Sequence, residues 1–159
     1  MRVYIPATLP LLRRWRAAGT VGPTPMTAYA VTPGLREWYA SADAEELEYA
    51  ASGRAARASL RLLGGIGEAR RVVLAVDPPA DAVTSRDDLD EGAVTVAGEL
   101  PWRLVAAGLV DTAGAQDAVG KAVLAVDAAD LGDEDAELTV GDAEDHELAW
   151  YATQELADL

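Results

Sequence analysis

Residues 43–63 read DAEELEYAASGRAARASLRLL, and this stretch predicts one long helix around which the rest of the chain is organised. Asp43 is a suitable N-cap, and Glu46 follows at the spacing of a capping box, so both can satisfy free N–H groups of the first turn. Residues 64–67, GGIG, come next. A phosphate-binding loop would follow a strand, whereas these glycines follow a helix, so they predict a helix stop.

Two apolar faces run along this predicted helix. The first has the spacing of a core-facing stripe, and the second lies on the far side. The first face consists of Leu47, Ala50, Ala51, Ala55, Ala58 and Leu62, and the second face consists of Tyr49, Gly53, Ala56, Leu60 and Leu63. A helix that is apolar on two sides is buried on two sides, so the second face contacts the rest of the chain, a second copy or another protein. Glycine costs about 1 kcal/mol relative to alanine inside a helix, so Gly53 favours a close contact there.

A row of three arginines, Arg54, Arg57 and Arg61, separates the two faces. The row could bind an anion or a partner's carboxylate, or it could pair with acids of the same chain. We favour internal pairing because residues 1–71 carry a net charge of +4 and residues 72–159 a net charge of −18. The total of −14 repels phosphate, which argues against binding to nucleic acid.

The composition indicates one folded domain over residues 1–159. Hydrophobic residues make up 50% of the 159, enough to form a core. The absence of cysteine excludes disulfides, thiol nucleophiles and thiolate metal ligands, and it favours an intracellular protein. The first residues make a poor signal peptide, and no apolar run reaches the ~18 residues that span a bilayer. We therefore expect a cytoplasmic protein that does not bind membranes.

The order of the expected elements predicts an α+β fold. Strands are expected at residues 2–5, 26–31, 71–76, 93–96, 104–110 and 148–151, with a short edge strand beginning near Val83. Further helices are expected at residues 8–18, 32–39 and 112–126. This order, βαβαα and then strands with one further helix, favours parallel pairing in the first half. We expect a mixed sheet of about five or six strands with three or four helices, and the alternative is a three-layer α/β arrangement.

Residues 131–146 are mostly acidic and predict a solvated, mobile loop with a short strand at residues 138–140. The acids lack the D-x-D-x-D-G order of a calcium loop, so we predict no metal site. His146 is the only histidine, and it lies between Asp145 and Glu147. Without a cysteine or a G-x-S-x-G motif it has little with which to form a nucleophilic site. We predict no catalytic residue and no cofactor.

Five segments are distinctive: MRVYIPATLPLL (1–12), AVTPGLREWY (30–39), LEYAASGRAARASLRLL (47–63), RRVVLAVD (70–77) and LAWYATQEL (148–156). Together they resemble a family of small, acidic, uncharacterised actinobacterial proteins that is classed as a domain of unknown function. The resemblance spans most of the chain. It implies a bacterial, cytoplasmic single domain, and it supplies no activity, cofactor or partner.

Three functions fit these features. We favour a non-enzymatic interaction or regulatory protein that forms a homodimer or binds a protein partner through the second face. The alternative is an anion-binding module that uses Arg54, Arg57 and Arg61. An enzyme that uses acidic residues together with His146 is the third, and we favour it least.

Overall fold

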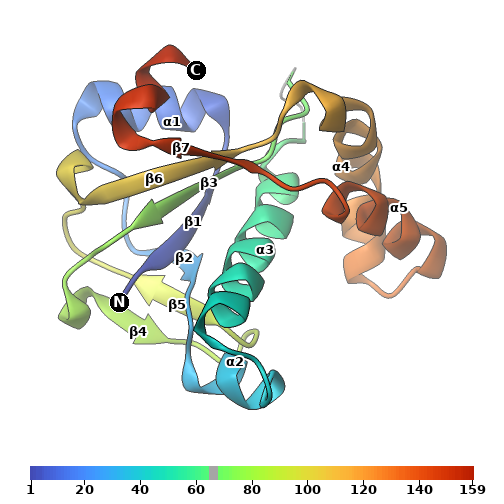
Figure 1. Ribbon diagram of the computed structural model, residues 1–159, viewed down its shortest axis with the longest axis horizontal. Coiled ribbons are helices and arrows are strands. Elements are labelled where there is room, and N and C mark those ends of the chain that lie inside the picture. Colours follow the sequence, from blue (N-terminus) through green and yellow to red (C-terminus); the bar gives the residue numbers. More distant parts are fainter. Residues whose placement is uncertain (65–67) are drawn as a thin grey trace.

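The fold is an antiparallel sheet with helices on both faces, and Figure 1 shows it in a computed structural model that describes residues 1–64 and 68–159. Of the helix stop predicted at residues 64–67, only Gly64 is among the described residues. Over the described range the architecture is α+β, as predicted. No helix in that range is both long and apolar enough to cross a membrane.

The strands are β1 (Val3–Ala7), β2 (Met26–Tyr29), β3 (Val72–Val76), β4 (Val83–Ser85), β5 (Ala93–Val96), β6 (Val105–Val110) and β7 (Ala149–Ala152). The α-helices are α1 (Leu9–Ala18), α2 (Pro33–Trp38), α3 (Ala44–Leu62), α4 (Gln116–Asp130) and α5 (Glu134–Glu144). Short 3-10 turns are η1 (Ala80–Ala82), η2 (Trp102–Leu104), η3 (Ala113–Ala115) and η4 (Thr153–Asp158). The described residues thus hold more strands and helices than we predicted.

Side-chain caps explain why three of these helices begin where the sequence predicts. The side chain of Thr8 accepts a hydrogen bond from the N–H of Leu11 at the start of α1, and Thr32 does the same for α2. Asp43 accepts from the N–H of Glu46 at the start of α3. Each cap satisfies one of the N–H groups that a helix leaves free in its first turn.

The sheet has the order β4-β5-β2-β1-β3-β6-β7, and every neighbouring pair is antiparallel. The predicted parallel pairing, and with it the mixed sheet, is therefore wrong. After α1, residues 19–25 carry the chain back along the sheet, so β2 enters antiparallel to β1. The crossover through α2 and α3 does make β3 run in the same direction as β2, but β1 lies between those two strands.

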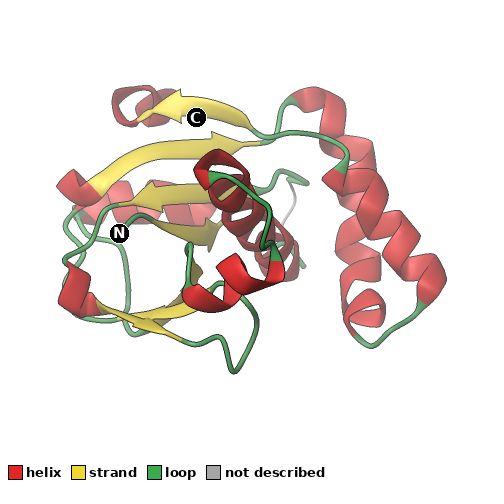
Figure 2. Ribbon diagram, turned by 60° about the horizontal axis from the view of Figure 1, so that its bottom comes forward, coloured by secondary structure: helices red, strands yellow, loops and turns green. Residues whose placement is uncertain are grey.

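The two faces of the sheet carry separate cores because successive side chains of a strand point to opposite faces. On one face, Val72, Leu74 and Val76 of β3 pack with Leu12 and Trp15 of α1. On the other face, residues of β3 and β1 pack with α3. Figure 2 shows α3 in front of the sheet, with α4 and α5 standing as a pair beside it. All five residues of β3 are buried, which confirms that it is an interior strand.

Residues 131–146 are mainly helix α5, so both the predicted loop and the predicted strand at residues 138–140 are wrong. Asp133 caps the helix by accepting from the N–H of Ala136. Acids in the first turn interact favourably with the positive end of the helix dipole. Val140 and Ala143, three residues apart, are buried against α4. The cluster of acids therefore marks the start of a helix rather than a loop. The three-residue spacing of Val140 and Ala143 was the sequence signal for this helix.

Asp87 joins the start of α2 to the segment between β4 and β5. Its carboxylate accepts hydrogen bonds from Thr32 Oγ1 (2.6 Å), Ser85 Oγ (2.9 Å) and the N–H groups of Gly34 (3.0 Å) and Gly92 (2.9 Å). Burial acts to raise the pKa of Asp87, but these donors together hold that pKa below its ordinary value. The carboxylate therefore works in its ionised form.

We expect Asp87→Ala to lower the free energy of unfolding by about 1–3 kcal/mol, because it leaves several donors without an acceptor. Asp88→Ala is the matched control, since Asp88 is exposed and pairs with the side chain of Arg86 at the surface. Urea unfolding measures both variants. Equal midpoints for the two would contradict the role of Asp87 as a junction.

Candidate functional site

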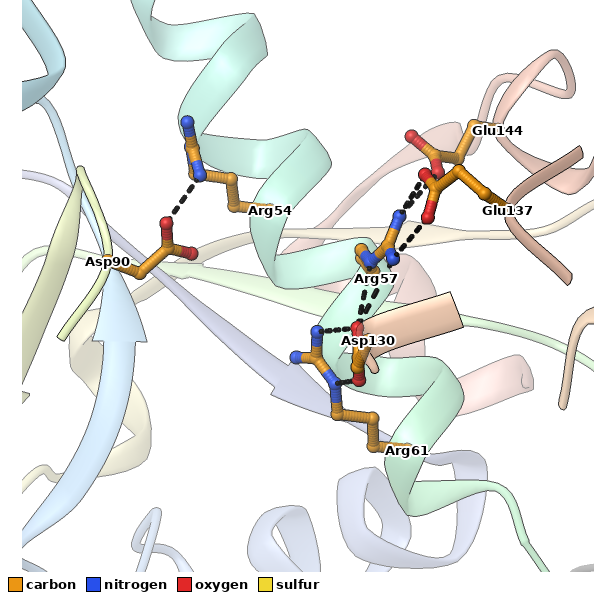
Figure 3. A network of polar contacts seen from close by, with 7 residues as sticks. All are labelled: Arg54, Arg57, Arg61, Asp90, Asp130, Glu137 and Glu144. Carbon is orange, nitrogen blue, oxygen red and sulfur yellow. Dashed lines mark hydrogen bonds and ion pairs between the residues drawn. The ribbon is translucent and has the colours of Figure 1, made fainter. Parts of the chain in front are cut away.

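The arginine row of α3 pairs with carboxylates of the acidic half of the chain (Figure 3). Arg57 donates to Glu137 (2.9 Å), Glu144 (3.2 Å) and Asp130 (3.2 Å). Arg61 donates to both carboxylate oxygens of Asp130, at 2.7 and 3.0 Å. These contacts tie α3 to the pair of helices α4 and α5. They show the internal pairing that we favoured for Arg57 and Arg61.

The same contacts shift the pKa values of the groups involved. The hydrogen bond from Arg61 and, after it, that from Arg57 hold the pKa of Asp130 below its ordinary value. The hydrogen bond from Arg57 lowers the pKa of Glu137, and its partners raise the pKa of Arg57. Both carboxylates are therefore ionised at neutral pH, and the contacts between α3 and the helix pair are charge-assisted.

This arrangement predicts a loss of stability in acid. A carboxyl group whose pKa is lower in the folded protein stabilises it fully above the unfolded pKa, and that contribution disappears as pH falls. Between about pH 5 and about pH 3, the free energy of unfolding should fall more in the wild type than in Asp130→Asn, by about 1 kcal/mol for partly exposed pairs. Urea unfolding at each pH measures the difference. Parallel curves for the two proteins would contradict this prediction.

Arg54 is the least saturated member of the row. It donates to Asp90 Oδ1 at 2.7 Å, and its Nη2 lies 3.9 Å from a carboxylate oxygen of Glu91. Its Nε is buried and has no hydrogen-bond acceptor among the described residues. A buried N–H without an acceptor is energetically costly. Arg54 therefore has an unsatisfied hydrogen-bond donor, which Arg57 and Arg61 do not show among the described residues.

The structure divides the second face of α3 into a covered and an open part. Leu60 and Leu63 are buried against apolar residues of α4 and α5, and Ala56 is buried beside them on α3. Tyr49 is 62% exposed and Gly53 is exposed as well. A Cβ at Gly53 would meet no atom within 4 Å outside its own helix backbone and chain neighbours, so the close contact expected at Gly53 does not occur within the described chain.

Four of the six residues of the first face of α3 are buried, and Ala50 is partly buried. Leu47, Ala51, Ala55 and Ala58 are buried, whereas Leu62 is 41% exposed. Leu62 lies in the last turn of α3, beyond the part that packs on the sheet, so its position on the stripe does not bury it.

Tyr49 stands where three grooves meet. The largest, of about 960 Å³, runs between α2, α3 and α5 and contains the arginine row. Two smaller grooves, of about 250 and 260 Å³, lie on the other side of Tyr49 toward β6 and β7. Both smaller grooves are also lined by Ser52 and Leu109, so we treat them together as the α3–β7 trough.

The α3–β7 trough has an apolar floor and aromatic walls. Ala75 of β3 and Leu109 of β6 form the floor, and both side chains belong to the face on which α3 packs. Tyr49 forms one wall, and Trp150 of β7, which is paired in register with Leu109, forms the other. The indole of Trp150 is 63% exposed. The two largest side chains of the trough are therefore open to solvent.

Among the described residues, the charges around the trough that lack a partner of opposite sign are negative. Of the carboxylates that line it, Glu144 pairs with Arg57, whereas Glu45, Glu48 and Glu147 have no basic partner. Its two arginines are already paired, Arg2 with Asp77 at 3.0 Å and Arg71 with Asp111 at 2.8 Å. Because the arginines are neutralised, the trough presents a negative surface that attracts cations.

Tyr4 lies beneath this rim and donates its hydroxyl proton to Glu48 at 2.6 Å. Burial and this hydrogen bond raise the pKa of Tyr4. The phenol therefore stays neutral, and it holds the Glu48 carboxylate in place at the edge of the trough.

His146 lines the trough at the end near Arg71. Its carbonyl oxygen accepts a hydrogen bond from Arg71 Nη2 at 2.8 Å, and its side chain is exposed. In the part of the chain that the structure describes, no group of three or more His, Asp or Glu side chains lies close enough together to hold a metal ion. The sequence did not single out Trp150 or Leu109, because their exposure and pairing depend on the order of distant strands.

Comparison with known proteins gives a family and no activity. A family model described as a family of unknown function (DUF6912) matches residues 1–159, which confirms the resemblance to a domain of unknown function. No curated protein and no solved structure matches the chain.

Proposed function

We propose that this chain, which belongs to the family of unknown function DUF6912, is a non-enzymatic protein-interaction module. Its α3–β7 trough binds basic side chains of a protein partner. One observation carries the proposal: Tyr49 and Trp150, 62% and 63% exposed, form opposite walls of a trough rimmed by carboxylates.

The chemistry of the trough matches an arginine or lysine side chain. A cation over an exposed aromatic ring gains about 0.5–1 kcal/mol, and more when the contact is desolvated. Glu45 and Glu147 have no side-chain partner among the described residues, so each can accept a charge-assisted hydrogen bond from the incoming side chain. The apolar floor contributed by Ala75 and Leu109 can pack against the methylene groups of that side chain.

The net charge of the chain also favours a basic partner. A net charge of −14 produces a field that draws basic segments toward the surface and accelerates their association. Specificity then depends on the trough, because its aromatic walls are local features that net charge does not supply.

A capped peptide of alternating arginine and leucine residues tests this function by calorimetry. We expect saturable binding that weakens at least several-fold in Tyr49→Ala and in Glu45→Gln. A peptide with glutamate in place of arginine should give no heat of binding. Leu124→Ala and Asp127→Asn are the matched controls, since both residues are exposed on α4 and lie away from the trough.

Two results would contradict the proposal. One is the absence of saturable binding. The other is an equal loss of affinity in Glu45→Gln and Asp127→Asn, which would mean that the peptide responds to net charge alone.

An anion-binding module is a second candidate, and the buried Nε of Arg54 without an acceptor favours it. An oxyanion in the large groove could accept from this N–H while Asp90 keeps its contact with Nη1. Titration with inorganic phosphate, followed through the Nε–H resonance of Arg54, tests the idea. A saturable shift of this resonance is expected, and Arg54→Lys should abolish phosphate binding measured by calorimetry. An unchanged resonance in the wild type would contradict the idea.

A further inference from the structure

We propose that the chain forms a symmetric dimer in which β7 pairs antiparallel with β7 of a second copy, centred on Trp150. This inference goes beyond the binding of a basic partner and rests on different observations. They are the position of β7 in the sheet, the direction of its backbone groups, and the residues that would face each other.

Strand β7 is an outer strand of the described sheet, and its neighbour on the inner side is β6. Figures 1 and 2 both show it at the margin of the sheet. Its residues, Ala-Trp-Tyr-Ala, include no proline and no charge, which are the usual devices that protect an edge strand. The opposite edge, β4, has only three residues. Of the two edges, β7 is therefore the better template for another strand.

The free edge of β7 presents the backbone groups of Trp150. The N–H of Asp111 bonds to the carbonyl of Arg71, so groups of β6 in the same phase, including those of Leu109, point toward β3. In an antiparallel ladder these directions alternate, so Gly108 and Val110 point toward β7 and bond their partners Tyr151 and Ala149. The N–H and C=O of Trp150 consequently point away from the sheet.

A second contact supports this assignment independently. The N–H of Ala152 donates to the side chain of Glu155 at 3.2 Å, which requires that it also points away from β6. Because Ala152 and Trp150 are two residues apart in a strand, their N–H groups point the same way.

A second copy fits this edge because the edge is complementary to itself. With Trp150 opposite Trp150 of the second copy, the two residues exchange both N–H···O=C bonds, and Leu148 lies opposite Ala152. Glu147 then faces Thr153 rather than another acid, so no like charges oppose each other across the paired strands. In this register the N–H of Ala152 exchanges its Glu155 acceptor for a backbone carbonyl.

The same register also brings side chains of the two copies into contact. The two Trp150 indoles, each 63% exposed in the single chain, become cross-strand neighbours on the α3 side of the sheet. Aromatic cross-strand pairs are among the contacts that stabilise antiparallel strands. Since Trp150 is a wall of the α3–β7 trough, the dimer would bring the troughs of the two copies together at the axis. The −14 charge of each copy opposes association, so added salt should strengthen the dimer.

Native mass spectrometry and light scattering on the purified chain test the dimer. We expect the mass to approach twice that of the monomer as protein concentration and salt rise. Trp150→Pro should remain monomeric yet folded, because proline removes only the N–H that points away from β6. Trp150→Glu should also be monomeric, because it places two carboxylates at the symmetry axis.

Leu124→Glu is the matched control, since it adds one charge at a leucine that is 88% exposed on α4, and it should dimerise like the wild type. A wild-type chain that stays monomeric at every concentration and salt would overturn the proposal. So would a Trp150→Glu variant that dimerises as well as Leu124→Glu. A monomer that still binds the arginine–leucine peptide would overturn the dimer and leave the proposed function intact.

Discussion

Replacing Asp111 with alanine is expected to lower the free energy of unfolding by about 3–5 kcal/mol. Asp111 is fully buried and receives three hydrogen bonds from Arg71, two from the guanidinium (2.8 and 2.9 Å) and one from the backbone N–H (2.8 Å). The Arg71 side chain is itself only 2% exposed. Removal of the carboxylate leaves a buried positive charge without a counter-ion, since the other acceptor of the guanidinium, the carbonyl oxygen of His146, is neutral.

Urea unfolding of matched variants measures this effect. Asp77→Ala is the control, because Asp77 pairs with Arg2 in the same two-bond geometry but both side chains are about half exposed. We expect the control to cost less than about 1 kcal/mol. The double variant Arg71→Met/Asp111→Leu should recover much of the stability, because no buried charge remains. Equal losses in Asp111→Ala and Asp77→Ala would contradict the account of this pair.

Val73→Asp is expected to prevent folding. Val73 is fully buried in β3, between the neighbouring strands β1 and β6, and it belongs to the core beneath α3. A carboxylate there would lose its hydration without gaining a partner, at a cost of several kcal/mol. That cost is comparable with the whole stability of a typical domain, about 5–15 kcal/mol.

Circular dichroism and thermal melting measure the outcome. Leu124→Asp introduces the same charge at a leucine that is 88% exposed, and its melting temperature should stay close to that of the wild type. A Val73→Asp protein that purifies with an unchanged melting temperature would show that β3 is not an interior strand.

The sequence predicted only part of the candidate site. The sequence predicted the arginine row of α3 and its pairing with acids, because opposite charge in the two halves of the chain is visible in composition. It did not predict which acids would bind: Glu137 and Glu144 come from the segment 131–146 that we expected to be a loop, and Asp130 directly precedes it at the end of α4. It also did not predict the trough, since Ala75, Leu109 and Trp150 meet only through the order of β3, β6 and β7.

The sequence by itself determined the structural elements that depend on contacts between residues close together in the chain. The caps at Thr8, Thr32 and Asp43, the two-sided helix α3 and the apolar run of β3 depend on contacts between near neighbours, so their spacing is sufficient to predict them. Only the tertiary structure decided the strand order, the antiparallel directions and the open face beside Tyr49. These depend on contacts between residues far apart in the chain, such as Arg71 with Asp111, and on which surfaces the α4–α5 pair leaves uncovered when Leu60 and Leu63 pack against it.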